Sequence, residues 1–164
     1  MAHFDSIIDQ KQILKRELLK NQEVVNLLVN VGSNVEEFEN IRTGSKSPAA
    51  KLIKTHFYVP GTTTVDQNFI GMRSRIVYAD TDVIKETVLV VYVICNDDHI
   101  ELLQGSRADL LANEIDKILN NGESIFGVGG IKIGVAEEVR YADGYSGWEI
   151  PYKTHEFNRE AERL

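Results

Sequence analysis

The most informative stretch of this sequence is Val88-Leu89-Val90-Val91-Tyr92-Val93-Ile94-Cys95. It is an almost unbroken apolar run rich in β-branched residues, and it is far shorter than the roughly 20 residues that a membrane-spanning helix needs. β-branched side chains favour strands, and a strand that is apolar at every position is typically buried on both faces. The stretch therefore predicts a central strand over residues 86–95.

The composition indicates one globular domain over residues 1–164. The chain has 164 residues, of which 43% are hydrophobic and 26% are charged, which is enough for one core but not for two. Its net charge of −7 argues against broad, affinity-driven binding of nucleic acid, because that mode depends on Lys and Arg. The lone Cys95 can form no internal disulfide, and no Cys/His pair has the spacing of zinc ligands. Met1–Asp5 lacks the basic and apolar regions of a signal peptide, so we expect a chain that neither spans a membrane nor is conventionally secreted.

The N-terminal region, residues 1–31, predicts two helices. Asn21 interrupts an amphipathic pattern and is a residue type that often caps a helix, so we expect one helix over 6–20 and another over 22–30. The apolar positions that define the pattern are Ile7, Leu14, Leu18, Val25 and Leu28.

Two more strands are predicted before the central one. Alternating apolar and polar residues predict a strand over 52–59, stopped by Pro60-Gly61, and a second strand over 70–79. A turn at 79–82 then leads into the central strand.

A helix and two strands are predicted after the central strand. Ser106-Arg107-Ala108-Asp109 has the spacing of a self-capping helix start, and Asn121-Gly122 is a stop, so we expect a helix over 107–121. Strands are expected over 130–139 and 148–157, joined by a hairpin at 141–147. The charged tail, 159–164, is expected to fray.

This order predicts an α+β fold, with a mainly antiparallel sheet of about five strands and helices packed on one face. Residues 52–158 hold the sheet together with the helix over 107–121.

Few residues indicate catalysis. Asp97-Asp98-His99 collects two carboxylates and an imidazole, but consecutive residues at a strand end point in different directions, which favours a solvated turn. Cys95 closes an apolar strand and is expected to be an inert buried thiol. Gly127-Val128-Gly129-Gly130 lacks the preceding strand and the Lys-Ser or Lys-Thr of a phosphate-binding loop. His56 and His155 have no neighbours that complete a catalytic triad. We therefore expect no enzyme, and no cofactor or metal.

Two polar loops indicate assembly instead. Gly32–Pro48 and Pro60–Asn68 are longer than a compact monomer of this size needs, and such segments often become ordered only against a partner.

The C-terminal half resembles the tail terminator and tail-completion proteins of long-tailed bacteriophages. The resemblance covers about residues 52–158 and is one of element order with a few shared residues. It depends on the central strand running into Asn96-Asp97-Asp98, the helix opening Arg107-Ala108-Asp109-Leu110-Leu111-Ala112, the closing segment Gly144-Tyr145-Ser146-Gly147-Trp148, and Tyr152 to Phe157-Asn158.

The resemblance implies a structural virion protein, assembled in the bacterial host cytoplasm. Such a protein would form a homohexameric ring on the last ring of the tail tube, end its polymerisation and meet the head connector. Genomic DNA would be passing cargo, and the resemblance leaves open whether a tail sheath is also bound. On this reading, four cationic side chains are candidates for contacts with neighbours: Arg42, Lys46, Arg73 and Arg75.

Three alternatives stay open. Another neck component, such as a head-completion or connector-stopper protein, shares the small α+β character. A small metal-dependent enzyme would use Asp97, Asp98 and His99. A regulatory or ligand-binding domain would need a defined pocket.

Overall fold

The two N-terminal helices are separated at Asn21, as predicted. A computed structural model describes residues 4–58, 60–61, 67–78, 84–120 and 128–157. Helix α1 spans Phe4–Lys20 and helix α2 spans Gln22–Val29. The Asn21 side chain accepts a hydrogen bond from the backbone N–H of Val24 at 3.0 Å, which caps α2.

The polar loop after α2 is ordered by the chain's own side chains. Asn26 is buried, and its amide oxygen accepts hydrogen bonds from the Ile41 N–H at 3.0 Å and from Gln22 Nε2 at 2.9 Å. Asn30 bonds both the N–H and the carbonyl of Glu39. The loop also contains two short 3₁₀ turns, η1 over Val35–Glu37 and η2 over Pro48–Lys51. The expectation that Gly32–Pro48 needs a partner to become ordered was therefore wrong; most of Pro60–Asn68 lies outside the described residues.

The predicted strand over 52–59 was also wrong. Within its described part, the segment makes one isolated parallel bridge, between Ile53 and Ile70. Three backbone hydrogen bonds join it to the first sheet strand: Lys54 N–H to the Ile70 carbonyl (2.7 Å), Ile70 N–H to the Leu52 carbonyl (2.9 Å) and Met72 N–H to the His56 carbonyl (3.3 Å). The alternating sequence reflects side chains that pack over this edge without forming a regular ladder.

The sheet is antiparallel, with the predicted apolar strand at its centre. Strand β1 spans Phe69–Tyr78, β2 spans Ile84–Asn96 and β7 spans Tyr145–Phe157. β2 pairs with β1 on one side and β7 on the other, and its residues from Val88 to Cys95 are all buried. The prediction of a central strand is confirmed.

The last edge of the sheet is split into two strands. β5 over Val128–Ile133 and β6 over Glu137–Ala142 pair with successive parts of β7. The sequence predicted one strand over 130–139. Pro151 of β7 lies opposite the break, and its carbonyl accepts one hydrogen bond from the Gly134 N–H at 2.7 Å before the ladder stops. Because proline has no N–H, Pro151 cannot donate the second hydrogen bond of this pair, and regular pairing resumes only at β6.

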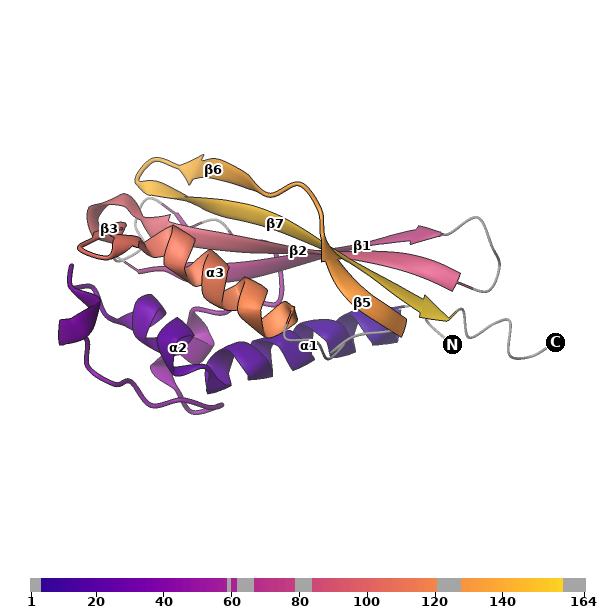
Figure 1. Cartoon of the computed structure of the whole chain (residues 1–164), viewed down its shortest axis with the longest axis horizontal. Coiled ribbons are helices and arrows are strands. Elements are labelled where there is room, and N and C mark those ends of the chain that lie inside the picture. Colours follow the sequence, from indigo (N-terminus) through magenta and orange to yellow (C-terminus); the bar gives the residue numbers. More distant parts are fainter. Residues whose placement is uncertain (1–3, 59, 62–66, 79–83, 121–127, 158–164) are drawn as a thin grey trace.

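Helix α3, over Arg107–Leu119, packs with α1 and α2 on one face of the sheet (Figure 1). It is preceded by a 3₁₀ turn, η3 over Asp97–His99, and by the short strands β3 (Glu101–Leu102) and β4 (Gly105–Ser106). The α+β class, the five-stranded antiparallel sheet and the helices on one face are confirmed.

The predicted details at the two ends of α3 were less accurate. Ser106 occupies the N-cap position but makes no side-chain capping bond. The first N–H of the helix, that of Arg107, bonds the Ile100 carbonyl at 2.7 Å. The stop at Asn121-Gly122, the turn at 79–82 and the tail 159–164 lie outside the described residues. Among the helices that the structure describes, none is long and apolar enough to cross a membrane.

Replacing Gly147 with Ala is expected to destabilise the fold strongly. A Cβ atom at Gly147 would overlap the Val93 carbonyl oxygen and lie 2.7 Å from the carbonyl carbon, so β2 and β7 could not keep their spacing. We expect Gly147→Ala to lower the free energy of unfolding by about 3 kcal/mol or more, measured by urea denaturation. Gly32→Ala is the matched control, because its Cβ would meet the Phe38 ring at an ordinary 3.6 Å. Equal stability of the two variants would contradict the described β2–β7 packing.

Candidate interaction surfaces

One face of the sheet is covered by none of the helices that the structure describes, and we call it the open face (Figure 1). Side chains that share it are set by the strand register, in which Arg75 lies opposite Val88, and Val88 opposite Lys153. Both Val88 and Val90 are buried on this face. The helices lie on the other side, where Asp109 of α3 accepts a hydrogen bond from Trp148 Nε1 at 2.7 Å.

Aromatic side chains pack at one end of the open face. The ring centroids of Phe57 and Tyr92 are 4.7 Å apart, and those of Tyr92 and Tyr141 are 6.1 Å apart. The Arg73 guanidinium lies 5.9 Å from the centre of the Tyr92 ring. The chain before Phe57 approaches closely because Gly71 has no side chain; a Cβ there would lie 3.3 Å from the His56 carbonyl oxygen. Burial raises the pKa of the Tyr92 phenol, an effect that Arg73 partly opposes.

Cations form a row across the open face, which we call the basic row: Arg73, Arg75, Lys132 and Lys153. Lys132 of β5 lies directly opposite Lys153 of β7, and both side chains are exposed. Lys153 has one distant partner, Glu86, at 3.8 Å. Among the described residues no carboxylate pairs with Arg73 or Arg75. Like charges directly opposite each other on a sheet lower its stability by about 0.2–1 kcal/mol. The Lys132–Lys153 pair therefore lowers the stability of the isolated chain.

Two carboxylates oppose each other further along the same face. Glu137 of β6 is the register partner of Glu149 of β7. The open face therefore carries the basic row, with Glu86 beside Lys153, and a separate pair of carboxylates further along.

A second charged surface lies at the end of the molecule where η1 meets η3 and β3. We call it the acidic end: Glu36, Glu37, Asp97, Asp98 and Glu101, all exposed. The segments 31–41 and 96–106 that carry it contain no Lys or Arg. They are joined by hydrogen bonds from the Leu103 N–H to the Ser33 carbonyl (2.8 Å) and from Gln104 Nε2 to Asn34 Oδ1 (2.7 Å).

Arg107, the first residue of α3, holds the acidic end together. Its side chain is completely buried, and it donates hydrogen bonds to three backbone carbonyls, those of Leu27, Gly32 and His99. The guanidinium also lies 5.3 Å from the centre of the Phe38 ring. Burial lowers the pKa of Arg107, and its charge is balanced by carbonyl dipoles instead of a carboxylate.

The sequence pattern of α3 indicates that Arg107 is buried, although we did not predict its burial from the sequence. Residues 107, 111, 115 and 119 recur every four positions and are all buried, so the arginine occupies the apolar stripe of α3. A cation in such a stripe indicates a buried polar contact.

The structure separates the four cations predicted as contact residues. Arg73 and Arg75 lie on the open face. Arg42 and Lys46 are exposed in the loop that packs on the helices, where the Gly44 N–H bonds the Leu19 carbonyl at 2.8 Å. The four do not form one surface.

Asp97, Asp98 and His99 form the turn η3, as expected of a solvated strand end. Both carboxylates are exposed, whereas His99 Nε2 is buried without a hydrogen-bond partner. No group of three or more His, Cys, Asp or Glu among the described residues is arranged to hold a metal ion.

Two other features add no chemistry of their own. Cys95 is fully buried, and burial raises the pKa of its thiol to about 12. A pocket of about 300 Å³ lies between the start of α3 and the β6–β7 hairpin. Its lining includes Asp109 and Trp148, which already bond each other.

Comparison with known proteins gives one family match. The family model named YomW matches residues 21–154. No curated protein matches the chain.

Removing Arg107 is expected to destabilise the protein. Arg107→Ala leaves three buried carbonyls without their donor, so we expect a loss of about 3 kcal/mol in urea denaturation. Arg107→Lys should also be destabilising, because one ammonium cannot reproduce the planar fork. The control is Arg140→Ala, since Arg140 and its partner Asp143, 3.8 Å away, are both exposed. A loss no greater than that of the control would contradict the assigned role.

The thiol of Cys95 is expected to be unreactive in the folded protein. With a pKa of about 12, only about one thiol in ten thousand is ionised at pH 8, and the side chain is fully buried. A thiol-specific chromogenic reagent should therefore label the chain only after denaturant is added. Rapid labelling under native conditions would contradict the buried position.

Proposed function

The chain belongs to the YomW family, which is Bacillus phage-derived, and from this premise we propose that it is a structural protein of the phage virion. It forms a ring at the head-proximal end of the tail, ends polymerisation of the tail tube and joins the tail to the head connector. The ring assembles from copies of this chain in the cytoplasm of the bacterial host.

The proposal depends mainly on two concentrations of like charge on the described surface, in which the only ion pair that the structure describes is the 3.8 Å contact between Lys153 and Glu86. The basic row places Lys132 opposite Lys153, and the acidic end is held in shape by the buried Arg107. Like charges held opposite each other cost some stability in the isolated chain. In a subunit of an assembly such surfaces are useful, because charge complementarity selects the partner and the orientation of a contact.

The order of elements also supports the proposal. β2 leads into α3, and β5, β6 and β7 follow α3 along the chain, which is the order of elements on which the resemblance to tail terminators depends. Fold alone does not determine function, so the proposal depends on the surfaces and on the phage origin of the family together.

Phage particles produced without this protein are expected to have defective tails. Electron microscopy of such a preparation should show tails of uncontrolled length or DNA-filled heads without attached tails. Supplying the protein in trans should restore joined particles. Virions of normal appearance in its absence would refute the proposed role.

The same preparation distinguishes a neck protein of the portal side. Purified chain should bind isolated tail tubes if it completes the tail. Binding to DNA-filled heads, with no binding to tubes, would instead assign it to the head side of the junction.

A further inference from the structure

We propose that the basic row on the open face of one copy receives the acidic end of the next copy. This inference rests on the proposed function and deepens it, because it identifies the surfaces through which the ring closes. The partner is thus a second copy of this chain.

Charge complementarity is the first argument. The basic row has four cations, and its Lys132–Lys153 pair has only the 3.8 Å contact of Lys153 with Glu86 to offset its repulsion among the described residues. The acidic end offers five exposed carboxylates, and the two segments that carry them contain no Lys or Arg. Docking the acidic end on the basic row relieves repulsion on both surfaces.

Exposed apolar side chains accompany both charged surfaces. Phe57 and Val77 lie beside the basic row and are 48% and 40% exposed. Leu103 and Val31, at the acidic end, are 76% and 53% exposed. Apolar contacts of this kind supply affinity, while the charges set the orientation.

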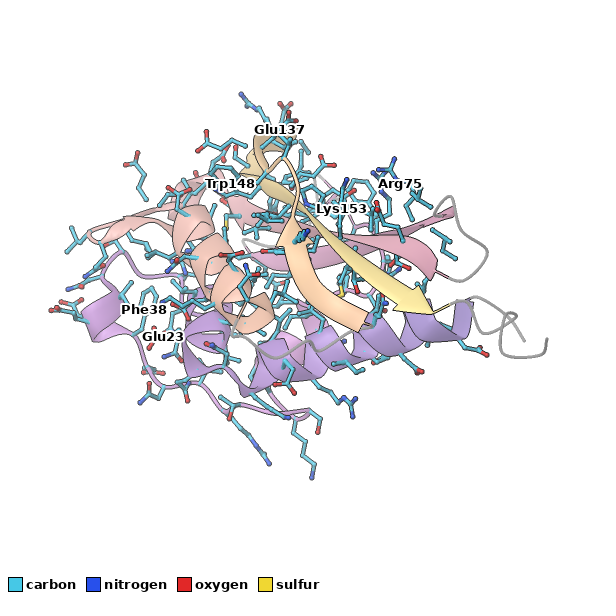
Figure 2. All side chains as sticks on the ribbon, turned by 45° about the vertical axis from the view of Figure 1, so that its right-hand side comes forward. Glu23, Phe38, Arg75, Glu137, Trp148 and Lys153 are labelled. Atoms are coloured by element: carbon cyan, nitrogen blue, oxygen red, sulfur yellow. The ribbon has the colours of Figure 1, made fainter. Side chains whose placement is uncertain are left out.

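The position of the two surfaces makes the contact head-to-tail. Figure 2 shows Arg75 and Lys153 on the sheet, well away from Phe38, which packs against Arg107 at the acidic end. A contact between two different surfaces leaves one of each free on every new copy. Addition therefore continues until the rotation between copies closes a ring.

Two other occupants of the basic row are less favoured. Nucleic acid would have to approach a chain whose net charge is −7. A face-to-face dimer would use the Glu137–Glu149 pair as the anion, but that pair offers two carboxylates against five at the acidic end.

Paired charge reversals test the inference. The first variant, Arg75→Glu with Lys132→Glu, reverses part of the basic row; Lys132→Glu also faces Lys153 favourably, so this variant should stay folded. The second, Glu36→Lys with Glu101→Lys, reverses part of the acidic end. A third, Glu23→Lys with Glu137→Lys, is the matched control, because both carboxylates are exposed and lie outside the two surfaces.

Mass in solution, measured by light scattering over a range of concentrations, is the readout, with circular dichroism to confirm folding. We expect the control to self-associate like the natural chain, and each of the first two variants to self-associate about tenfold or more weakly. Mixing the first two variants should restore assembly, because the intact acidic end of one meets the intact basic row of the other, and the reversed surfaces also match.

Several outcomes would overturn the inference. One is that the second variant self-associates as strongly as the natural chain, and another is that the control alone loses assembly. The others are that the mixture of the first two variants fails to assemble, or that the natural chain stays monomeric at every concentration. Its failure is distinguishable from failure of the proposed function, since phage lacking the protein would then still have unjoined or overlong tails.

Discussion

The buried guanidinium of Arg107 is the interaction on which the shape of this molecule's acidic end depends. It links the end of α2, the loop after it and the turn after β2 through three backbone carbonyls. The same segments, about 70–80 residues apart in sequence, are also joined by the hydrogen bonds of Gln104 and by core packing of Leu27 and Leu28 against α3. A buried cation stabilises little by itself, because its desolvation offsets much of its hydrogen bonding. Its role is to fix one arrangement of exposed carboxylates.

The sheet provides the complementary surface by a different means. The strand register places Arg75 of β1, Lys153 of β7 and Lys132 of β5 in one line across the sheet. Alternating charges at these positions would stabilise the isolated chain better. The same register places the buried Val88 between Arg75 and Lys153 on this face. Both surfaces therefore combine an ordered backbone with like charges, for which the described residues provide one ion pair, Lys153 with Glu86. Such a combination is expected of a subunit.

Local signals allowed much of the fold to be predicted. The apolar run at Val88–Cys95 and the capping Asn21 each act through neighbouring residues, and both predictions were confirmed. The break between β5 and β6 was missed because its cause, Pro151, lies about 15 residues away on another strand. The basic row was only half foreseen for the same reason: Arg73 and Arg75 share a strand, whereas their alignment with Lys132 and Lys153 depends on pairing across the sheet. Arg107 could have been identified from its place in the apolar stripe of α3.

The central claim is that this chain acts as a subunit packed against its own copies at the junction of head and tail. The most direct measurement is a cryo-electron microscopy reconstruction of the neck of intact virions. We expect a closed ring of this chain on the last ring of the tail tube, with the acidic end of each copy on the basic row of its neighbour. A neck in which the chain is absent, or is present only as separate copies that do not touch, would contradict it.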